Sequence, residues 1–200
     1  MPTTILRITP HDHGRQMSLD EFEPAEVQEG YIYELGRGVI IASEVPEPRH
    51  FAQVIASRRQ FSAYELLYPQ RIYGIAGGSD CKILVPGLDS ERHPDLAIYK
   101  TPPPKQKKVW SRWLPELVIE VVAADSKHRD YVEKRDEYLL AGVREYWIID
   151  ADRCEMLALQ NNGGAWIEEI IRPPLIYQTA LLPGFSFDCG LVFHVAEAAK

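Results

Sequence analysis

Short apolar runs separated by turn-forming residues recur along most of the chain, and their composition is typical of β-strands. Residues 31–35 and 39–42 flank Gly36-Arg37-Gly38 and predict a β-hairpin. The run 146–149, Tyr-Trp-Ile-Ile, is apolar throughout, which indicates a strand buried on both faces. Further strands are expected at 71–75, 81–85, 95–99 and 116–122, as members of one sheet, at 154–159 and 166–171 around the turn 161–164, and after Pro183.

Three longer segments have the signals of helices. Ser18-Leu-Asp-Glu21 is a capping box and predicts a short helix over 18–26. Apolar residues at steps of three and four, with no interrupting glycine or proline, predict a long helix from Pro48 to Leu67. A helix from Lys127 to Ala141, ended by Gly142, connects the strands at 116–122 and 146–149, so we expect these two strands to be parallel. With a short amphipathic helix after Pro183, the pattern predicts an α/β (α+β) fold: a mixed central sheet flanked by helices, with additional antiparallel hairpins.

The length and composition fit a globular domain, with 200 residues of which 46% are hydrophobic. We expect one domain over 18–200 and an N-terminal extension over 1–17. Three cysteines without metal-ligand spacing, no signal-peptide pattern and no run of about 18 apolar residues predict a cytoplasmic protein without a membrane partner. The formal net charge of −7 excludes a molecule-wide positive field, so any contact with nucleic acid must be local.

Two carboxylates belong to predicted strands. Glu120 lies in the apolar run 116–122, where a buried charge needs a cation, a proton or hydrogen-bond donors; a solvated strand end or a basic partner would satisfy it equally. Asp95 follows Pro94 and opens the preceding strand. If the strands are neighbours, the carboxylates lie roughly 5 Å apart and repel unless they share a proton or a metal. An all-oxygen pair suits Mg²⁺ or Mn²⁺ better than zinc.

A candidate third member comes from the helix at 127–141. Asp130, Lys134 and Tyr138 are spaced four residues apart and share one face. If this helix crosses over the sheet, Lys134 is aimed back at Asp95 and Glu120. Spacing alone favours an ordinary Asp–Lys pair on a solvated surface.

Together these residues resemble the Uma-two-like restriction endonucleases of bacteria, a family of the PD-(D/E)XK nuclease superfamily. The resemblance extends from about residue 18 to 194. It rests on Pro115-Glu-Leu-Val-Ile-Glu-Val-Val122, on Asp130, Lys134 and Tyr138, on Gly142-Val-Arg-Glu-Tyr-Trp-Ile-Ile-Asp150, and upstream on Tyr33-Glu-Leu35, His50 and Pro94-Asp-Leu-Ala-Ile98, with Leu182-Pro-Gly184 near the end. It implies a restriction-endonuclease-like core and a Mg²⁺-dependent endonuclease that cuts DNA.

The resemblance also implies roles for single residues. Asp95 and Glu120, with the carbonyl of Val121, would bind Mg²⁺, for which Mn²⁺ can substitute. Many superfamily members keep a lysine two residues after the second acid; this chain has Val122 there, and Lys134 matches the helical lysine that orients or activates the attacking water.

Two further matches have less definite roles. Glu34 would contact an auxiliary metal or water, and His50 the substrate or a transferred proton, although a helix-start histidine bonded to its own backbone fits His50 equally. The chain also departs from the family, because Ala123 and Ala124 replace a common serine and proline and remove a hydroxyl near the metal. Whether the site is active is therefore left open.

DNA binding requires local positive charge, and two runs offer it. One is the proline-stiffened loop after 99, with Trp110 and Trp113 interleaved; the other opens the helix at 127. The candidate substrate-binding residues are Lys105, Lys107, Lys108, Arg112, Lys127 and Arg129. A solvated, mobile loop is the alternative for the first run.

Three functional classes remain open at this point. The leading hypothesis is a metal-dependent endonuclease that hydrolyses DNA. The alternative is a catalytically silent nuclease-like module that binds nucleic acid or protein, and an enzyme acting on another phosphorylated substrate has no motif of its own. A homodimer through the aromatic-rich strands after 145 is compatible with the sequence.

Overall fold

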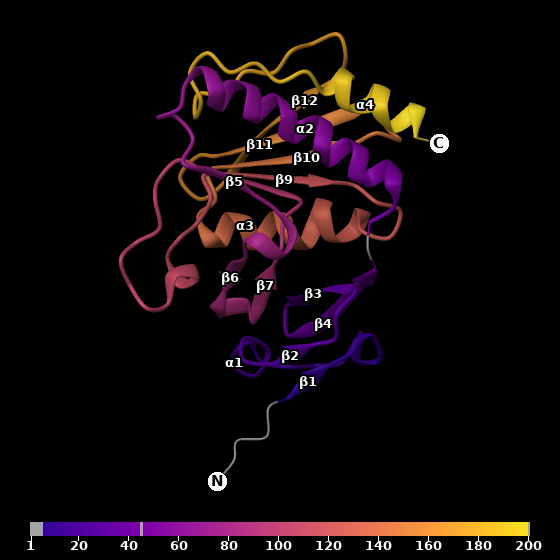
Figure 1. Ribbon diagram of the computed structural model, residues 1–200, viewed down its shortest axis with the longest axis vertical. Helices are drawn as coiled ribbons and strands as arrows, with labels where there is room; N and C mark the ends of the chain where they lie inside the picture. Colours follow the sequence, from indigo (N-terminus) through magenta and orange to yellow (C-terminus); the bar gives the residue numbers. More distant parts are fainter. Residues whose placement is uncertain (1–5, 45, 200) are drawn as a thin grey trace.

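A six-stranded mixed sheet forms the centre of the protein in a computed structural model that describes residues 6–44 and 46–199 (Figure 1). Its strand order is β12-β11-β10-β9-β8-β5. The strands are β5 (Gly74–Ala76), β8 (Leu96–Tyr99), β9 (Leu117–Val121), β10 (Glu145–Asp150), β11 (Glu155–Asn161) and β12 (Trp166–Ile171). β9 and β10 are parallel and the other neighbours antiparallel, which confirms the predicted parallel pair and the predicted hairpin at 161–164.

Helices cover both faces of this sheet (Figure 1). α2 (Pro48–Leu67) and α4 (Cys189–Ala198) lie together on one face, where Phe61 packs against Trp147 of β10. α3 (Lys134–Ala141) lies on the other face and ends at Gly142, whose φ of +93° is the left-handed conformation that the sequence predicted for this position. The predicted α/β class with a mixed, helix-flanked sheet is thus confirmed.

A second, four-stranded sheet lies on the far side of α3, with strand order β4-β3-β7-β6. Its strands are β3 (Tyr31–Gly36), β4 (Val39–Glu44), β6 (Ile83–Val85) and β7 (Ser90–Arg92). β3 and β4 are the predicted hairpin. The prediction that 81–85 belongs to the central sheet is wrong, because β6 pairs instead with β7, a polar strand that has no apolar pattern to reveal it.

Small elements complete the N-terminal part. α1 (Leu19–Phe22) begins at Ser18 with the predicted capping box, but it is shorter than the predicted 18–26, because Pro24 ends it and β2 (Glu26–Val27) follows to pair with β1 (Arg7–Ile8). Ile8 is fully buried, so the described part of residues 1–17 contributes to the core beside α1. Short 3₁₀ turns span Pro10–Asp12, Gly78–Asp80, Pro86–Leu88 and Val109–Ser111.

After Pro183 the predicted helix is present as α4, but the predicted strand is reduced to one bridge between Tyr177 and Phe187. None of the helices in the described residues is long and apolar enough to cross a membrane.

Alternation along β9 decides which side chains meet which helix. Leu117, Ile119 and Val121 belong to the core beneath α2, whereas Val118 packs with α3. Glu120 has the same parity as Val118 and therefore points toward α3.

Candidate active site

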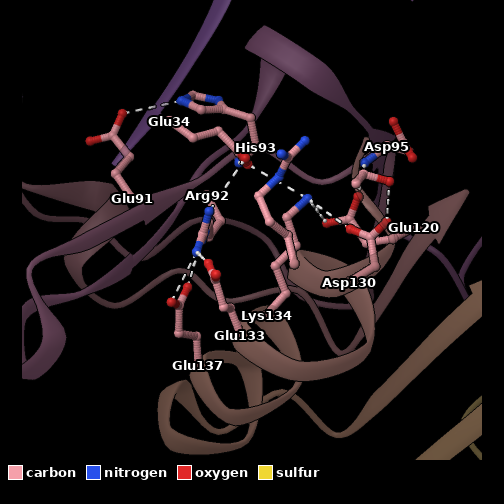
Figure 2. Close-up of polar contacts among 12 residues, drawn as sticks. Glu34, Glu91, Arg92, His93, Asp95, Glu120, Asp130, Glu133, Lys134 and Glu137 are labelled. Atoms are coloured by element: carbon pink, nitrogen blue, oxygen red, sulfur yellow. Dashed lines mark hydrogen bonds and ion pairs between the residues drawn. The ribbon is translucent and has the colours of Figure 1, made fainter. Parts of the chain in front are cut away.

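Asp95 and Glu120 lie side by side at one end of the β8–β9 pair (Figure 2). Leu96 pairs with Ile119 in antiparallel register, which brings the residue before β8 opposite Glu120. The backbone N–H of Asp95 lies 3.4 Å from Oε2 of Glu120. The Glu120 side chain is buried, whereas 22% of the Asp95 side chain is exposed, so the pair is reached from solvent on the side of Asp95.

His50 and the backbone of Val121 hold the Asp95 carboxylate. Oδ2 of Asp95 accepts a hydrogen bond from the Val121 N–H at 2.8 Å. Nε2 of His50, in the first turn of α2, lies 3.1 Å from Oδ2 of Asp95 and 3.1 Å from the carbonyl oxygen of Val121. Burial lowers the pKa of His50, but the hydrogen bond and charge of Asp95 outweigh it and raise that pKa above its ordinary value.

Lys134 reaches the same place from the first residue of α3, and its ammonium group is surrounded by carboxylates (Figure 2). Its Nζ lies 3.0 Å from Oε1 of Glu120, 3.4 Å from Oδ1 of Asp130 and 3.8 Å from Oε1 of Glu34. Burial alone lowers the pKa of Lys134, but the three carboxylates reverse this and raise it. Lys134 is therefore held as an ammonium ion.

The turn before Lys134 is a π-helix, Arg129–Glu133, within the predicted helix. The N–H of Lys134 bonds to the carbonyl of Arg129, five residues back, and the carbonyl of Asp130 accepts instead from the Tyr146 hydroxyl at 2.9 Å. A π-turn is rare and is frequently found at functional sites. Here it sets Asp130 and Lys134 on the face that meets Glu120.

The cluster carries more negative charge than its lysine can balance. Burial raises the pKa of Glu120 to about 8; Lys134 opposes this, while the charges of Asp95 and Asp130 add to it. Oε1 of Glu120 also accepts a 2.6 Å hydrogen bond from the Tyr138 hydroxyl. Burial raises the pKa of Asp130 in the same way. The site therefore favours a further proton or cation.

Arg92 of β7 is the residue that sequence reasoning missed. It is fully buried, and its guanidinium donates to Glu137 of α3 at 2.6 and 3.0 Å and to Glu133 at 3.1 Å. Its Nη1 lies 3.5 Å from Oε2 of Glu34. Arg92 thus ties Glu34 and α3 together (Figure 2).

Glu34 is fixed on both sides, since its Oε1 also accepts from the N–H of His93 at 2.8 Å. Burial would raise the pKa of Glu34, but Lys134 and Arg92 outweigh it and lower that pKa. Both oxygens of Glu34 therefore face cations or donors of the protein itself.

Room for the Arg92 guanidinium comes from a glycine on β3. A Cβ at Gly36 would lie 2.6 and 2.9 Å from the two Nη atoms of Arg92. No sequence signal marked Arg92, because a three-residue polar strand has neither apolar alternation nor a motif of its own.

The donor set has the chemistry that Mg²⁺ prefers. Asp95, Glu120 and the Val121 carbonyl offer hard oxygen ligands. Oδ2 of Asp95 and the carbonyl oxygen of Val121 each lie 3.1 Å from Nε2 of His50, so these two oxygens face the same position. The described residues contain no group of three or more His, Cys, Asp or Glu side chains arranged to hold a metal ion. This does not conflict with Mg²⁺, which is commonly bound by one or two carboxylates together with water and substrate phosphates. The residues present thus fit the metal that the sequence predicted.

The candidate substrate-binding residues divide between the two ends of the β8–β9 pair. Lys127 and Arg129 follow β9 at the end that holds Asp95 and Glu120. Lys127 lies 3.3 Å from Asp150, and Arg129 lies 3.7 Å from Asp125, so both are paired within the protein. Lys105, Lys107, Lys108 and Arg112 lie in the loop between β8 and β9, at the opposite end of these strands from Asp95 and Glu120.

Comparison with known proteins fits this fold. A crystal structure from Anabaena variabilis ATCC 29413, titled as a "putative nuclease belonging to DUF820", superposes with a TM-score of 0.68 at 19% identity, covering 90% of this chain and 99% of that one. The fold is the restriction-endonuclease-like fold. The family model described as "Putative restriction endonuclease" matches residues 19–191, and the chain belongs to this family, Uma2. No curated protein matches the chain.

Proposed function

We propose that this protein is an endonuclease that hydrolyses phosphodiester bonds of DNA with the help of a divalent metal ion. The observation that carries the proposal is the convergence of Asp95, Glu120 and the Val121 carbonyl beside the Lys134 ammonium, within a fold and family of restriction-endonuclease-like nucleases. Asp95, Glu120 and Val121 would hold Mg²⁺ or Mn²⁺. When bound, the metal polarises a phosphate oxygen and lowers the pKa of a coordinated water.

Lys134 acts in this proposal as a donor. Because three carboxylates hold it as an ammonium ion, it donates hydrogen bonds to the attacking water or to a phosphate oxygen and offsets the negative charge that develops there. Glu34 positions Lys134, since its own oxygens are already engaged by Arg92 and the His93 N–H. This role replaces the auxiliary metal contact expected from the sequence.

His50 positions Asp95. Its Nε2 is within hydrogen-bond distance of two proposed ligand atoms, Oδ2 of Asp95 and the Val121 carbonyl oxygen, and so fixes the side chain that would hold the metal. The hydroxyl absent at Ala123 and Ala124 has a neighbour that can substitute: Oγ of Ser126 is hydrogen-bonded to the Ala123 N–H and to Asp130.

The test combines cleavage with metal binding. We expect purified protein to nick or cut plasmid DNA with Mg²⁺ or Mn²⁺ and not with EDTA. Asp95→Ala, Glu120→Ala and Lys134→Ala should each lose cleavage, whereas Arg59→Ala, at an exposed position on α2, should cut like the wild type.

Calorimetry with Mn²⁺ separates the roles of these residues. The two carboxylate variants should lose Mn²⁺ binding, while Lys134→Ala should keep it, because the lysine is not a ligand. Cleavage that survives in all three variants would refute the assignment. DNA binding by a wild type that neither binds Mn²⁺ nor cuts would identify a silent binding module instead.

A further inference from the structure

An aromatic cluster lies at the end of the central sheet opposite the carboxylates. Trp113 lies between Tyr99, with ring centroids 4.2 Å apart, and Trp110, at 5.4 Å, and both neighbours are tilted by 33°. Tyr73 meets Trp113 edge to face at 6.0 Å, and 51% of Tyr73 is exposed. The indole Nε1 of Trp113 donates to the carbonyl of Thr101 at 3.0 Å. The cluster thus anchors the base of the loop between β8 and β9 and presents the Tyr73 ring to solvent.

The same loop carries a concentration of cations. Residues 101–113 contain no Asp or Glu, although the whole chain has 29 acidic against 22 basic side chains. Lys105, Lys107, Lys108 and Arg112 are exposed, and none of them has a carboxylate partner within residues 6–44 and 46–199. By contrast, the cations of the other predicted run, Lys127 and Arg129, each lie beside a carboxylate. Free positive charge therefore accumulates in the loop at one end of β8 and β9, at the left of Figure 1.

Unpaired cations next to an exposed aromatic ring are the features with which proteins hold single-stranded nucleic acid. The cations follow the phosphates, and the rings stack on bases without regard to sequence. In a duplex the base faces are covered by their neighbours, so an exposed tyrosine ring gains stacking only from unpaired bases.

We propose that Tyr73 and the loop cations Lys105, Lys107, Lys108 and Arg112 bind a single-stranded segment of the nucleic-acid substrate. The proposal rests on the proposed function for one point, that this segment continues to the carboxylate site. Tyr99 lies four residue steps beyond Asp95, which is about 13 Å along β8. The preferred substrate then has an unpaired stretch beside the cleavage position.

The test measures binding in EDTA, so that no cleavage occurs. We expect the wild type to bind a fluorescein-labelled 20-nucleotide single strand more tightly than the matching duplex, as measured by anisotropy. Tyr73→Ala should weaken single-strand binding at least about fivefold, since one stacked base contributes that much or more, and leave duplex binding unchanged. Tyr73→Phe, which keeps the ring, should bind like the wild type.

The lysines are tested by salt dependence. Lys107→Ala combined with Lys108→Ala should reduce the slope of log K against log salt by about 1.4 for the single strand, because each lost phosphate contact removes about 0.7. Arg59→Ala removes one exposed cation from α2 and should leave the slope unchanged.

The proposal is overturned if Tyr73→Ala binds the single strand like the wild type, or if the double lysine variant keeps the wild-type slope. It is also overturned if these variants lose binding to anionic phospholipid vesicles while single-strand binding is intact. Failure of the nuclease assignment looks different, because the wild type would then bind the single strand in EDTA through Tyr73 but not cut with Mg²⁺ or Mn²⁺.

Discussion

Three buried carboxylates of this protein, Glu120, Glu137 and Glu145, are compensated in different ways. Glu120 is held by an ammonium and a phenol, Glu137 by guanidinium groups, and Glu145 by hydrogen bonds from neutral donors with a smaller contribution from the charge of Arg144. Thr179 donates to one oxygen of Glu145 at 2.6 Å and Trp147 to the other at 3.0 Å. Among the described residues no cation forms an ion pair with Glu145, so its ionisation should cost stability, as it does for Glu120 and Asp130.

Glu145 predicts a pH dependence of folding. Burial raises the pKa of Glu145, against the opposing hydrogen bonds of Thr179 and Trp147 and the charge of Arg144. The folded state therefore keeps this proton at a pH where the unfolded chain has lost it. Its contribution to stability then falls as the pH rises from about 4.3, the unfolded value for Glu, through the raised folded pKa.

Glu145→Gln should remove this decline, since an amide can accept from Trp147 and donate to the Thr179 hydroxyl without titrating. Urea unfolding between pH 4 and 8 measures it: the stability of the variant relative to wild type should increase with pH across this range. If the stability difference between Glu145→Gln and the wild type is the same at every pH, the role assigned to Glu145 is contradicted.

At the scale of the elements, contacts between distant segments position the site. Gly77, directly after β5, packs closely against Asp95, directly before β8: a Cβ at Gly77 would lie 2.2 Å from the backbone carbonyl oxygen of Asp95. The φ of Gly77 is 175°, which any residue adopts, so the constraint is the contact and not the backbone conformation.

Gly77→Ala should therefore displace Asp95. We expect a loss of about 1–3 kcal/mol in stability from overpacking. We also expect Mn²⁺ affinity, measured by calorimetry, to fall by at least about tenfold, as for other changes that misplace a ligand. Gly74→Ala, in the adjoining strand with nothing within 4 Å of the added Cβ, is the matched control. Equal Mn²⁺ affinity in both variants would show that Gly77 does not position the ligand.

Arg92 connects the four-stranded sheet to α3. Among the described residues, replacing it leaves Glu137 with only the longer ionic contact to Arg37 at 3.5 Å and Glu34 with only that to Lys134 at 3.8 Å. Arg92→Met should therefore lower the free energy of unfolding by about 3–5 kcal/mol. Arg92→Met with Glu137→Met removes both charges of the closest pair and should restore a large part of that loss. Arg59→Met tests the same substitution at an exposed position and should change stability little. If the double variant is no more stable than Arg92→Met alone, the unpaired Glu137 carboxylate is not the cause of the loss in unfolding free energy.

At the scale of the whole molecule, charge is unevenly distributed. The net charge of −7 includes the acidic cluster around Lys134, while the free cations lie at the other end of the central sheet. The net charge of the whole chain therefore does not describe the local charge at either end of the central sheet. A divalent cation should act on the acidic end as a ligand of the folded state only.

Mn²⁺ should accordingly stabilise the protein against heat. At 100 times its Kd, one ion that binds only the folded state contributes about 2.7 kcal/mol, which raises Tm by roughly 5–11 °C for a chain of this size. Differential scanning calorimetry in EDTA and in Mn²⁺ measures this shift. It should vanish in the variant with Asp95→Ala and Glu120→Ala and persist in Glu29→Ala, which removes an exposed carboxylate. A shift that remains in the double variant would place the metal elsewhere.

The sequence by itself determined the parts whose signal is local. The capping box at Ser18, the apolar steps of α2, the left-handed residue after α3 and the run 146–149 each reflect hydrogen bonding or burial within a short stretch, and each is present. The proximity of the carboxylates Asp95 and Glu120 could also be predicted from the sequence, because consecutive strands commonly pair.

Only the tertiary structure decided the parts that depend on distant segments. Glu34 and Lys134, 100 positions apart, meet because the four-stranded sheet lies against α3, and Arg92 becomes a buried clamp for the same reason. The tertiary structure also places residues 81–85 in the four-stranded sheet. It places the basic loop at the end of β8 and β9 opposite Asp95 and Glu120. Local sequence cannot encode these outcomes. A buried charge is stable only beside an opposite charge or a hydrogen-bond partner, and here that partner comes from a distant segment and not from neighbours along the chain.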